Sequence, residues 1–445
     1  MKVILVLLDG LGDRTYARLG HKTPLAAART PNLDRIAAMG ANGTYHALSP
    51  GRCLPSEMAH FLMFGYNPAD FPGRGLLEAA GETVPFSDSD VLALAHLCRV
   101  EFDRNQRAFL VQGRDDIPGD RDFLSLFYKQ ISEYEDQKIQ FRLHQTGRND
   151  AILAICGHVS PDISDSDPVR GKSPIARVMP LADTKEPDRA AKTAEALNHY
   201  LAWCADQLKA LDGKPNARKP AVVPNFLVTQ RAGRKKPIAG FAEKWGFSPA
   251  MIASGGVYKG LAMELGFGFT RVRDSADPGK DLAERIQSAI DDPDHDFIHV
   301  HTKVPDQVSH RETPERKAEV ISALDSGFAG LLNLLETGEK NILAVVTADH
   351  STPSCSELIH SGETVPLAMA GGAIRKDPVC RFDEIAAAAG SLGQLRGADL
   401  MHMILNCTDR AMLQGLCLGA HKGAYRSESY PAFTMDKQKG NRQLS

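Results

Sequence analysis

The apolar run Val3-Ile4-Leu5-Val6-Leu7-Leu8 passes directly into Asp9-Gly10, and Ile342-Leu343-Ala344-Val345-Val346 passes into Thr347-Ala348-Asp349-His350. A short, fully apolar run that ends at polar residues is typical of a buried parallel strand, with the polar residues at its carboxyl end. Both stretches therefore predict central strands that deliver charged side chains to one edge of a sheet.

Similar buried strands are predicted over residues 151–156 and 297–300. Amphipathic helices are predicted between them, over residues 189–211, 280–291 and 314–337. Because strands alternate with helices, we expect an α/β fold around a largely parallel sheet.

The side chains that follow these runs are carboxylates and imidazoles, with no cysteine among them. They are Asp9, Asp306, His310, Asp349, His350 and His360. This mixture of ligands suits Mn²⁺ or Zn²⁺ and does not suit soft metals or iron–sulfur clusters. The set is larger than one tetrahedral ion needs, so it predicts two divalent ions, an arrangement that serves phosphoryl transfer.

Composition sets wider limits on the protein. The chain has 445 residues, a formal charge of −3 and eight scattered cysteines without a CxxC pair. The charge gives no sign of a nucleic-acid or membrane partner, and the scattered thiols indicate a reduced, cytoplasmic protein. The first apolar run is too short for a signal sequence or a membrane span. Nothing in the composition indicates an oligomeric state.

Position 9 must come close to position 306 if both hold metal, which is simplest if a domain is inserted between them. We expect a metal-binding domain from residues 1–80 and 236–445 and a smaller α/β domain from residues 81–235. The outgoing joint is Gly73-Arg74-Gly75 through Gly81, and the return joint is the polar segment 230–237.

Ser56, in Pro55-Ser56-Glu57, is the candidate nucleophile. A metal ion would lower the pKa of its hydroxyl, and a helix beginning there would favour an incoming phosphoryl group. The alternative is that Ser56 only caps the helix.

Several cations are placed to hold the anionic groups of a substrate. Lys303 lies three residues before Asp306, and Arg74, Arg231 and Arg234 lie in the two joints. Cations beside metals at a domain joint are suited to binding phosphate and carboxylate. A lone cation in a loop is, alternatively, simply solvated.

Long stretches of the chain resemble the archaeal type of cofactor-independent phosphoglycerate mutases, in the alkaline phosphatase superfamily. The resemblance covers residue 3 to about residue 420. The stretches that carry it are residues 9–14, 22–34, 59–68, 73–81, 165–168, 349–353, 360–362 and 396–401.

The resemblance implies an alkaline-phosphatase-like fold and a role for each matching residue. Ser56 matches the serine that becomes phosphorylated, and Lys303 matches a lysine near the phosphoryl group. One ion would be held by Asp306, His310 and His360, and the other by Asp9, Ser56, Asp349 and His350. Arg231 matches an arginine at the domain joint. The implied activity is interconversion of 3-phosphoglycerate and 2-phosphoglycerate, with no bisphosphoglycerate cofactor.

The inserted segment departs from the family pattern. Asn149-Asp150 stands where the family has a His-Arg pair, and Arg148 just before it is a candidate substitute. Two alternatives therefore stay open. One is a phosphotransferase or phosphatase on another small phosphorylated or phosphonate metabolite, as in homoserine-kinase-like relatives. The other is a non-enzymatic, metal-stabilised binding protein.

Overall fold

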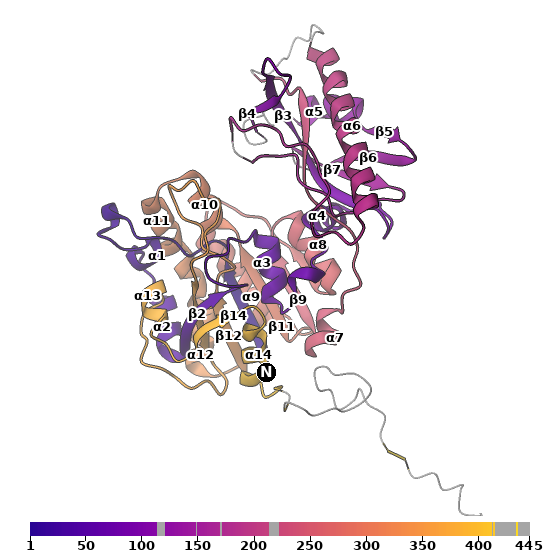
Figure 1. Ribbon diagram of the computed structural model, residues 1–445. Coiled ribbons are helices and arrows are strands. Elements are labelled where there is room, and N and C mark those ends of the chain that lie inside the picture. Colours follow the sequence, from indigo (N-terminus) through magenta and orange to yellow (C-terminus); the bar gives the residue numbers. More distant parts are fainter. Residues whose placement is uncertain are drawn as a thin grey trace, which may run out of the picture.

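The computed structural model describes residues 1–113, 121–147, 149–169, 171–212, 222–411, 413 and 433–434. Within these ranges the strands form two sheets, and each sheet belongs to a separate body with its own helices (Figure 1).

The larger sheet has the order β10-β9-β11-β1-β12-β13-β2-β14. β13 is antiparallel to its two neighbours, and all other pairs are parallel. The bounds are β1 (Lys2–Leu8), β2 (Ala41–His46), β9 (Pro249–Ala253), β10 (Gly268–Arg271), β11 (Phe297–Thr302), β12 (Ile342–Thr347), β13 (Val365–Ala370) and β14 (Gly393–Arg396).

The central strands β11 and β12 are buried along their whole length, as β1 is from Val3 onward, which requires cover on both faces. The cover comes from α1 (Pro24–Ala27), α2 (Pro31–Met39), α3 (Ser56–Met63), α7 (Phe241–Trp245), α8 (Gly256–Leu265), α9 (Pro278–Asp291), α10 (Val304–Arg311), α11 (Pro314–Asp325), α12 (Ala329–Thr337), α13 (Glu384–Ala387) and α14 (Asp399–Cys407). The predicted α/β fold with a mostly parallel sheet is confirmed.

The single helix predicted over residues 314–337 is wrong in its middle. A 3-10 turn, Ser326–Phe328, separates α11 from α12. Gly327 lies so close to α9 that a β-carbon there would be 2.9 Å from the Gly279 carbonyl oxygen. Of the helices in the described residues, this stretch alone is long and apolar enough to cross a membrane, yet Phe328 and Leu331 are fully buried in the protein core.

The smaller sheet consists of β3 (Val91–Phe102), β4 (Ala108–Gln112), β5 (Glu133–Asp136), β6 (Ile139–Gln145), β7 (Asp150–Cys156) and β8 (Phe226–Gly233). α5 (Arg121–Gln130) and α6 (Pro187–Asp212) complete this body. All its strands fall inside the predicted insertion, and all strands of the larger sheet fall outside it. The exact domain boundaries stay a prediction.

The smaller sheet is antiparallel in every pair, which the strand–helix alternation did not predict. A tight turn joins β5 to β6, with Gln137 and Lys138 in the left-handed conformation. Such hairpins need no crossover helix, so short local connections explain the antiparallel pairs β3–β4, β5–β6 and β6–β7, while β3 pairs with β7 and β8 over long connections.

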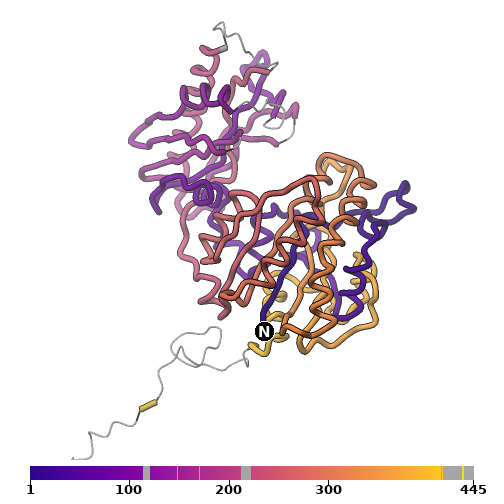
Figure 2. Tube along the Cα trace, turned by 180° about the vertical axis from the view of Figure 1, so that it is seen from behind, coloured from indigo at the N-terminus to yellow at the C-terminus, as the bar shows by residue number. Residues whose placement is uncertain are grey.

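The outgoing joint is a packed helix, α4 (Arg74–Glu82), which lies against α8 and against β3 and β8. Its glycines allow backbones to touch. A β-carbon on Gly81 would be 1.9 Å from the Gly256 carbonyl oxygen, and one on Gly260 would be 1.8 Å from that of Leu77. Figure 2 shows from behind how the two bodies meet at this end of the larger one. The joint is thus a close helix pair, and the glycines in the sequence explain it.

Candidate metal centre

Three neighbouring parallel strands bring the predicted ligands to one edge of the larger sheet. β1 lies between β11 and β12, in register from Leu8 opposite Thr302 and Leu7 opposite Thr347. Asp9 therefore emerges beside the start of α10, which carries Asp306 and His310, and beside Asp349-His350. The Asp9 amide donates to the Thr302 carbonyl oxygen at 3.0 Å, which fixes this alignment.

Four side-chain atoms from distant parts of the chain converge at the first group of ligands. His350 Nε2 lies 3.0 Å from Ser56 Oγ, 3.4 Å from Asp9 Oδ1 and 3.2 Å from Asp349 Oδ2. Asp9 and Asp349 are fully buried in their side chains. The predicted ligand set of Asp9, Ser56, Asp349 and His350 is thus assembled in space.

The unsatisfied atoms in this group show that a cation fits it. Asp9 Oδ1 and Asp349 Oδ2 are buried and accept no hydrogen bond within the described part of the chain. Their partner oxygens are engaged: Asp9 Oδ2 accepts from Tyr258, and Asp349 Oδ1 accepts from the amides of Gly10 and His350. Each carboxylate therefore turns one free oxygen toward His350 Nε2. Two buried anionic oxygens without donors are costly alone, and a divalent ion bound by both would satisfy them.

The second group is centred on Asp306. Its Oδ1 lies 3.1 Å from His310 Nε2 and 3.4 Å from His360 Nε2, and it also accepts from Thr352 Oγ1 at 3.0 Å. The rings of His350 and His360 stack with centroids 3.7 Å apart. His350 is close enough to belong to either group, so the two groups are adjacent and share this residue.

The charge states of His350 and Asp306 suit metal binding near neutral pH, whereas His360 must lose a proton to bind a metal ion. Burial lowers the pKa of His350 to about 3, so this imidazole is neutral with a free lone pair. Burial alone would raise the pKa of Asp306, but hydrogen bonds from His310 and His360 outweigh it and hold the pKa well below its usual range. Burial alone would lower the pKa of His360, but the hydrogen bond to Asp306 outweighs burial and raises this pKa.

Ser56 is the first residue of α3, and Pro55 occupies the N-cap position. No side chain caps this helix, so the alternative that Ser56 is only a capping residue is wrong. The hydroxyl lies against His350 and is nearly buried, at 7% exposure. Its place at the N-terminus of α3 favours an incoming anion.

The predicted substrate cations are placed unevenly. Lys303 precedes α10, and within the described residues its ammonium makes no hydrogen bond or ion pair, so it is free to bind an anion. Arg231 donates to Glu57 at 3.0 Å. Arg74 is bound by both Glu57 and Glu78, at 3.4 Å and 3.1 Å.

One further predicted cation, Arg234, is not brought to the metals. Arg234 donates to the Val159 carbonyl oxygen at 3.0 Å and lies 3.8 Å from Glu186, in the smaller body. Arg148 lies outside the described residues.

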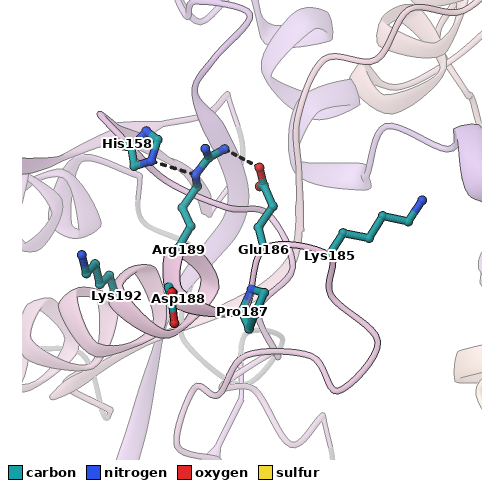
Figure 3. Close-up of a pocket in the computed structure, with 7 residues that line it drawn as sticks. All are labelled: His158, Lys185, Glu186, Pro187, Asp188, Arg189 and Lys192. Atoms are coloured by element: carbon teal, nitrogen blue, oxygen red, sulfur yellow. Dashed lines mark hydrogen bonds and ion pairs between the residues drawn. The ribbon is translucent and has the colours of Figure 1, made fainter.

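A pocket at the start of α6 contains none of the predicted site residues. It is lined by His158, Lys185, Glu186, Pro187, Asp188, Arg189 and Lys192 (Figure 3). Among these lining residues, Arg189 pairs with Glu186 at 2.6 Å and donates to His158 Nε2 at 3.1 Å. The Arg189 guanidinium is therefore already paired.

Four buried residues beside Asp9 and Asp349 had no assigned function from sequence. His301 Nε2 lies 3.1 Å from Asp9 Oδ2, and Tyr258 binds the same oxygen at 2.8 Å. His60 Nδ1 lies 2.8 Å from the Ser56 carbonyl oxygen, and His299 packs beside both histidines. The alternation of His299 and His301 along a strand was the available signal. Tyr258 gave none, because its proximity arises from folding alone.

Comparison with known proteins agrees with this geometry. The model of the metalloenzyme superfamily matches residues 1–407. A protein named 2,3-bisphosphoglycerate-independent phosphoglycerate mutase 2, from Methanocaldococcus jannaschii, is 39% identical over 94% of this chain and 96% of its own length. A 2,3-bisphosphoglycerate-independent phosphoglycerate mutase from Methanopyrus kandleri is 31% identical over 92% of this chain and 97% of its own.

Solved structures show the same likeness. The PH0037 protein from Pyrococcus horikoshii has a TM-score of 0.69 and 27% identity, with 93% of this chain and 99% of that chain covered. The cofactor-independent phosphoglycerate mutase from Thermoplasma acidophilum has a TM-score of 0.58 and 25% identity, with 92% and 100% covered.

Proposed function

Because the chain belongs to the metalloenzyme superfamily, and within it to the archaeal-type cofactor-independent phosphoglycerate mutases, we propose that it interconverts 3-phosphoglycerate and 2-phosphoglycerate without a bisphosphoglycerate cofactor. One observation carries this proposal: Ser56 Oγ lies 3.0 Å from His350 Nε2, the atom that the free oxygens of Asp9 and Asp349 also approach, at 3.4 and 3.2 Å. A purely metal-stabilised binding protein needs no hydroxyl there.

Two divalent ions complete the proposed centre, and the oxygen and nitrogen donors suit Mn²⁺ or Zn²⁺. Asp9, Ser56, Asp349 and His350 would hold one, and Asp306, His310 and His360 the other. When bound, such ions lower the pKa of a serine hydroxyl and offset the charge of a phosphoryl group.

The chain's own residues then carry the transfer. Ser56 Oγ attacks phosphorus in line, forming a Ser–O–P bond while the bond from phosphorus to the 3-oxygen of glycerate breaks. The proton lost by Ser56 ends on that 3-oxygen, so glycerate leaves as an alcohol. In the second half, the 2-oxygen of the same glycerate attacks phosphorus, the Ser56 Oγ–P bond breaks, and the proton of the 2-hydroxyl returns to Ser56 Oγ.

The cations and the smaller body support this sequence of steps. Lys303, free of partners within the described residues, is available to bind the equatorial phosphoryl oxygens. Arg231 reaches from β8 toward the nucleophile's helix and is suited to hold the glycerate carboxylate while its hydroxyls exchange. Excluding water from the phosphoserine would prevent hydrolysis, which separates a mutase from a phosphatase.

The test is a direct assay of the Mn²⁺-loaded protein with 3-phosphoglycerate and no bisphosphoglycerate. We expect 2-phosphoglycerate to form with little release of inorganic phosphate. Phosphate release or phosphoryl transfer on another small phosphorylated metabolite, without isomerisation, would instead favour a phosphotransferase or phosphatase. No comparison supports that alternative. The cytoplasmic location stays a prediction.

A further inference from the structure

Arg231 sits at an irregularity in the smaller sheet. Between β3 and β8, Leu92 faces Gly233 and Leu94 faces Gln230, so the single residue between the leucines faces both Arg231 and Ala232. This is a β-bulge, a feature that bends a strand and redirects a side chain. Arg231 adopts a φ of +55°, the left-handed region that disfavours every residue with a β-carbon. An arginine at such a position needs an explanation in its side chain.

A carboxylate holds the backbone of this bulge. The Arg231 amide donates to Asp165 Oδ1 at 2.6 Å. The next residue of the same loop, Ser166, exchanges hydrogen bonds with Thr229 just before the bulge, at 2.8 and 2.9 Å. The loop therefore fixes both the amide and the strand that leads to it.

A second carboxylate, which belongs to the larger body, binds the side chain of Arg231. Arg231 Nη1 donates to Glu57 Oε1 at 3.0 Å. Glu57 follows Ser56 directly on α3, and its side chain is 2% exposed. Its other oxygen lies 3.4 Å from Arg74, which secures Glu57 in turn. Within the described residues, the remaining guanidinium N–H groups of Arg231 make no hydrogen bond, and its side chain is 33% exposed.

We propose that Asp165 and Glu57 are positioning residues that together hold Arg231 in its left-handed bulge, beside the nucleophile's helix, with its unused donors available to the carboxylate of the bound glycerate. This inference rests on the proposed function for the identity of the anion. The bulge and the two carboxylates fix the cation before substrate arrives, so little side-chain entropy is lost on binding.

The test is a double-mutant cycle on kcat/KM for isomerisation in the Mn²⁺-loaded full chain, with Asp165→Ala, Arg231→Gly and the double variant. Arg231→Gly removes the cation but suits the left-handed backbone and keeps the amide. We expect it to lower kcat/KM by about 10- to 150-fold, the range for a lost hydrogen bond to a charged group, mainly by raising KM. Asp165→Ala should lower kcat/KM in the wild-type background and have no further effect in the Arg231→Gly background.

Three variants separate positioning from a structural effect. Asp165→Asn should keep nearly wild-type kinetics, because its amide oxygen still accepts the Arg231 N–H. Lys138→Gly is the matched control, since exposed Lys138 has a φ of +70° in the β5–β6 turn. It should relieve the same backbone strain and leave kcat/KM unchanged. Glu57→Gln should raise KM in the wild-type background more than in the Arg231→Gly background.

The inference is overturned if Arg231→Gly keeps wild-type kcat/KM, or if Asp165→Ala lowers it by the same factor in both backgrounds. Failure of the wild-type protein to isomerise 3-phosphoglycerate would instead refute the proposed function. In that event the positioning is judged by thermal unfolding, where Asp165→Ala must lower the Tm and Asp165→Asn must not.

Discussion

Two regions of the molecule are organised differently. The metal edge is the end of the larger sheet where Asp9 and Asp349 follow β1 and β12, and the joint face is the part of the smaller sheet where Arg231 contacts Glu57. At the metal edge, parallel strands end side by side, and the buried charges of Asp9 and Asp349 come together because the strands do. At the joint face, an antiparallel sheet presents Arg231 only through a bulge held by a loop carboxylate. Sheet topology therefore brings Asp9 and Asp349 together, whereas the cation that we propose to bind the substrate depends on a local irregularity.

Of all the changes considered, removal of the metal ions should distinguish the two regions most strongly. Chelation should lower activity by at least about 1,000-fold, because the nucleophile and the leaving oxygen both depend on bound cations, and Mn²⁺ should restore it. Elemental analysis should give two ions per chain, with fewer in His360→Ala. The two tryptophans report the regions separately, Trp245 in α7 and Trp203 in α6.

In single-tryptophan variants, chelation should shift the unfolding transition seen by Trp245, since ligands stabilise only the part that binds them. The transition seen by Trp203 should not move. An equal shift for both would show that the two bodies unfold as one unit.

A buried lysine stabilises the backbone next to the metal ligands. Lys317 is fully buried and donates to the carbonyl oxygens of Gly10, Gly12 and Thr352, and to Asp13 at 3.2 Å. Lys317→Met leaves Asp13 buried without its cation and should lower the free energy of unfolding by about 3–5 kcal/mol in urea denaturation. Arg107→Met, which breaks an exposed pair with Asp103 in the smaller sheet, should leave it unchanged within error. A comparable loss of unfolding free energy in both variants would contradict the expected difference between the buried and the exposed ion pair.

The joint between the regions should be intolerant of a single methyl group. Gly81→Ala places a β-carbon 1.9 Å from the Gly256 carbonyl oxygen, so α4 and α8 must separate. We expect a loss of about 1–3 kcal/mol, as for overpacking of an interior. Gly330→Ala, in the exposed face of α12, should stabilise by about 0.5–1 kcal/mol because helix interiors favour alanine. Stabilisation by both would show that the joint is loosely packed.

A further prediction concerns the pH dependence of stability. Burial raises the pKa of Glu384 to about 7, although Thr23 Oγ1 donates to its carboxylate. The folded state therefore keeps a proton that the unfolded state loses above its ordinary pKa of about 4.5. Stability should fall as pH rises from about 4.5 to about 7 and then level off, and Glu384→Gln should flatten this slope. Glu336→Gln, at an exposed pair with Arg35, is the control and should keep the slope.

The sequence predicted much of the metal edge because its signals are local. Apolar runs that end in Asp9 or Asp349 identify the strands and their carboxyl ends, and the resemblance supplies the remaining ligands. Tyr258 could not be assigned, since its contact with Asp9 exists only after α8 has packed beside β1. The alternation of His299 and His301 was a signal, but it does not show that His301 contacts Asp9. The strand–helix alternation also gave no sign of the antiparallel smaller sheet or of the bulge at Arg231, which depend on short turns and on a loop far away in the chain.

Intact-mass spectrometry of the Mn²⁺-loaded protein during turnover of 3-phosphoglycerate tests the central claim, that Ser56 carries the phosphoryl group, most directly. The wild-type protein should gain the mass of one phosphoryl group, located on Ser56 by peptide fragmentation, and Ser56→Ala should show neither the adduct nor isomerisation. A phosphoryl adduct that persists in Ser56→Ala, or isomerisation by that variant, would contradict the account.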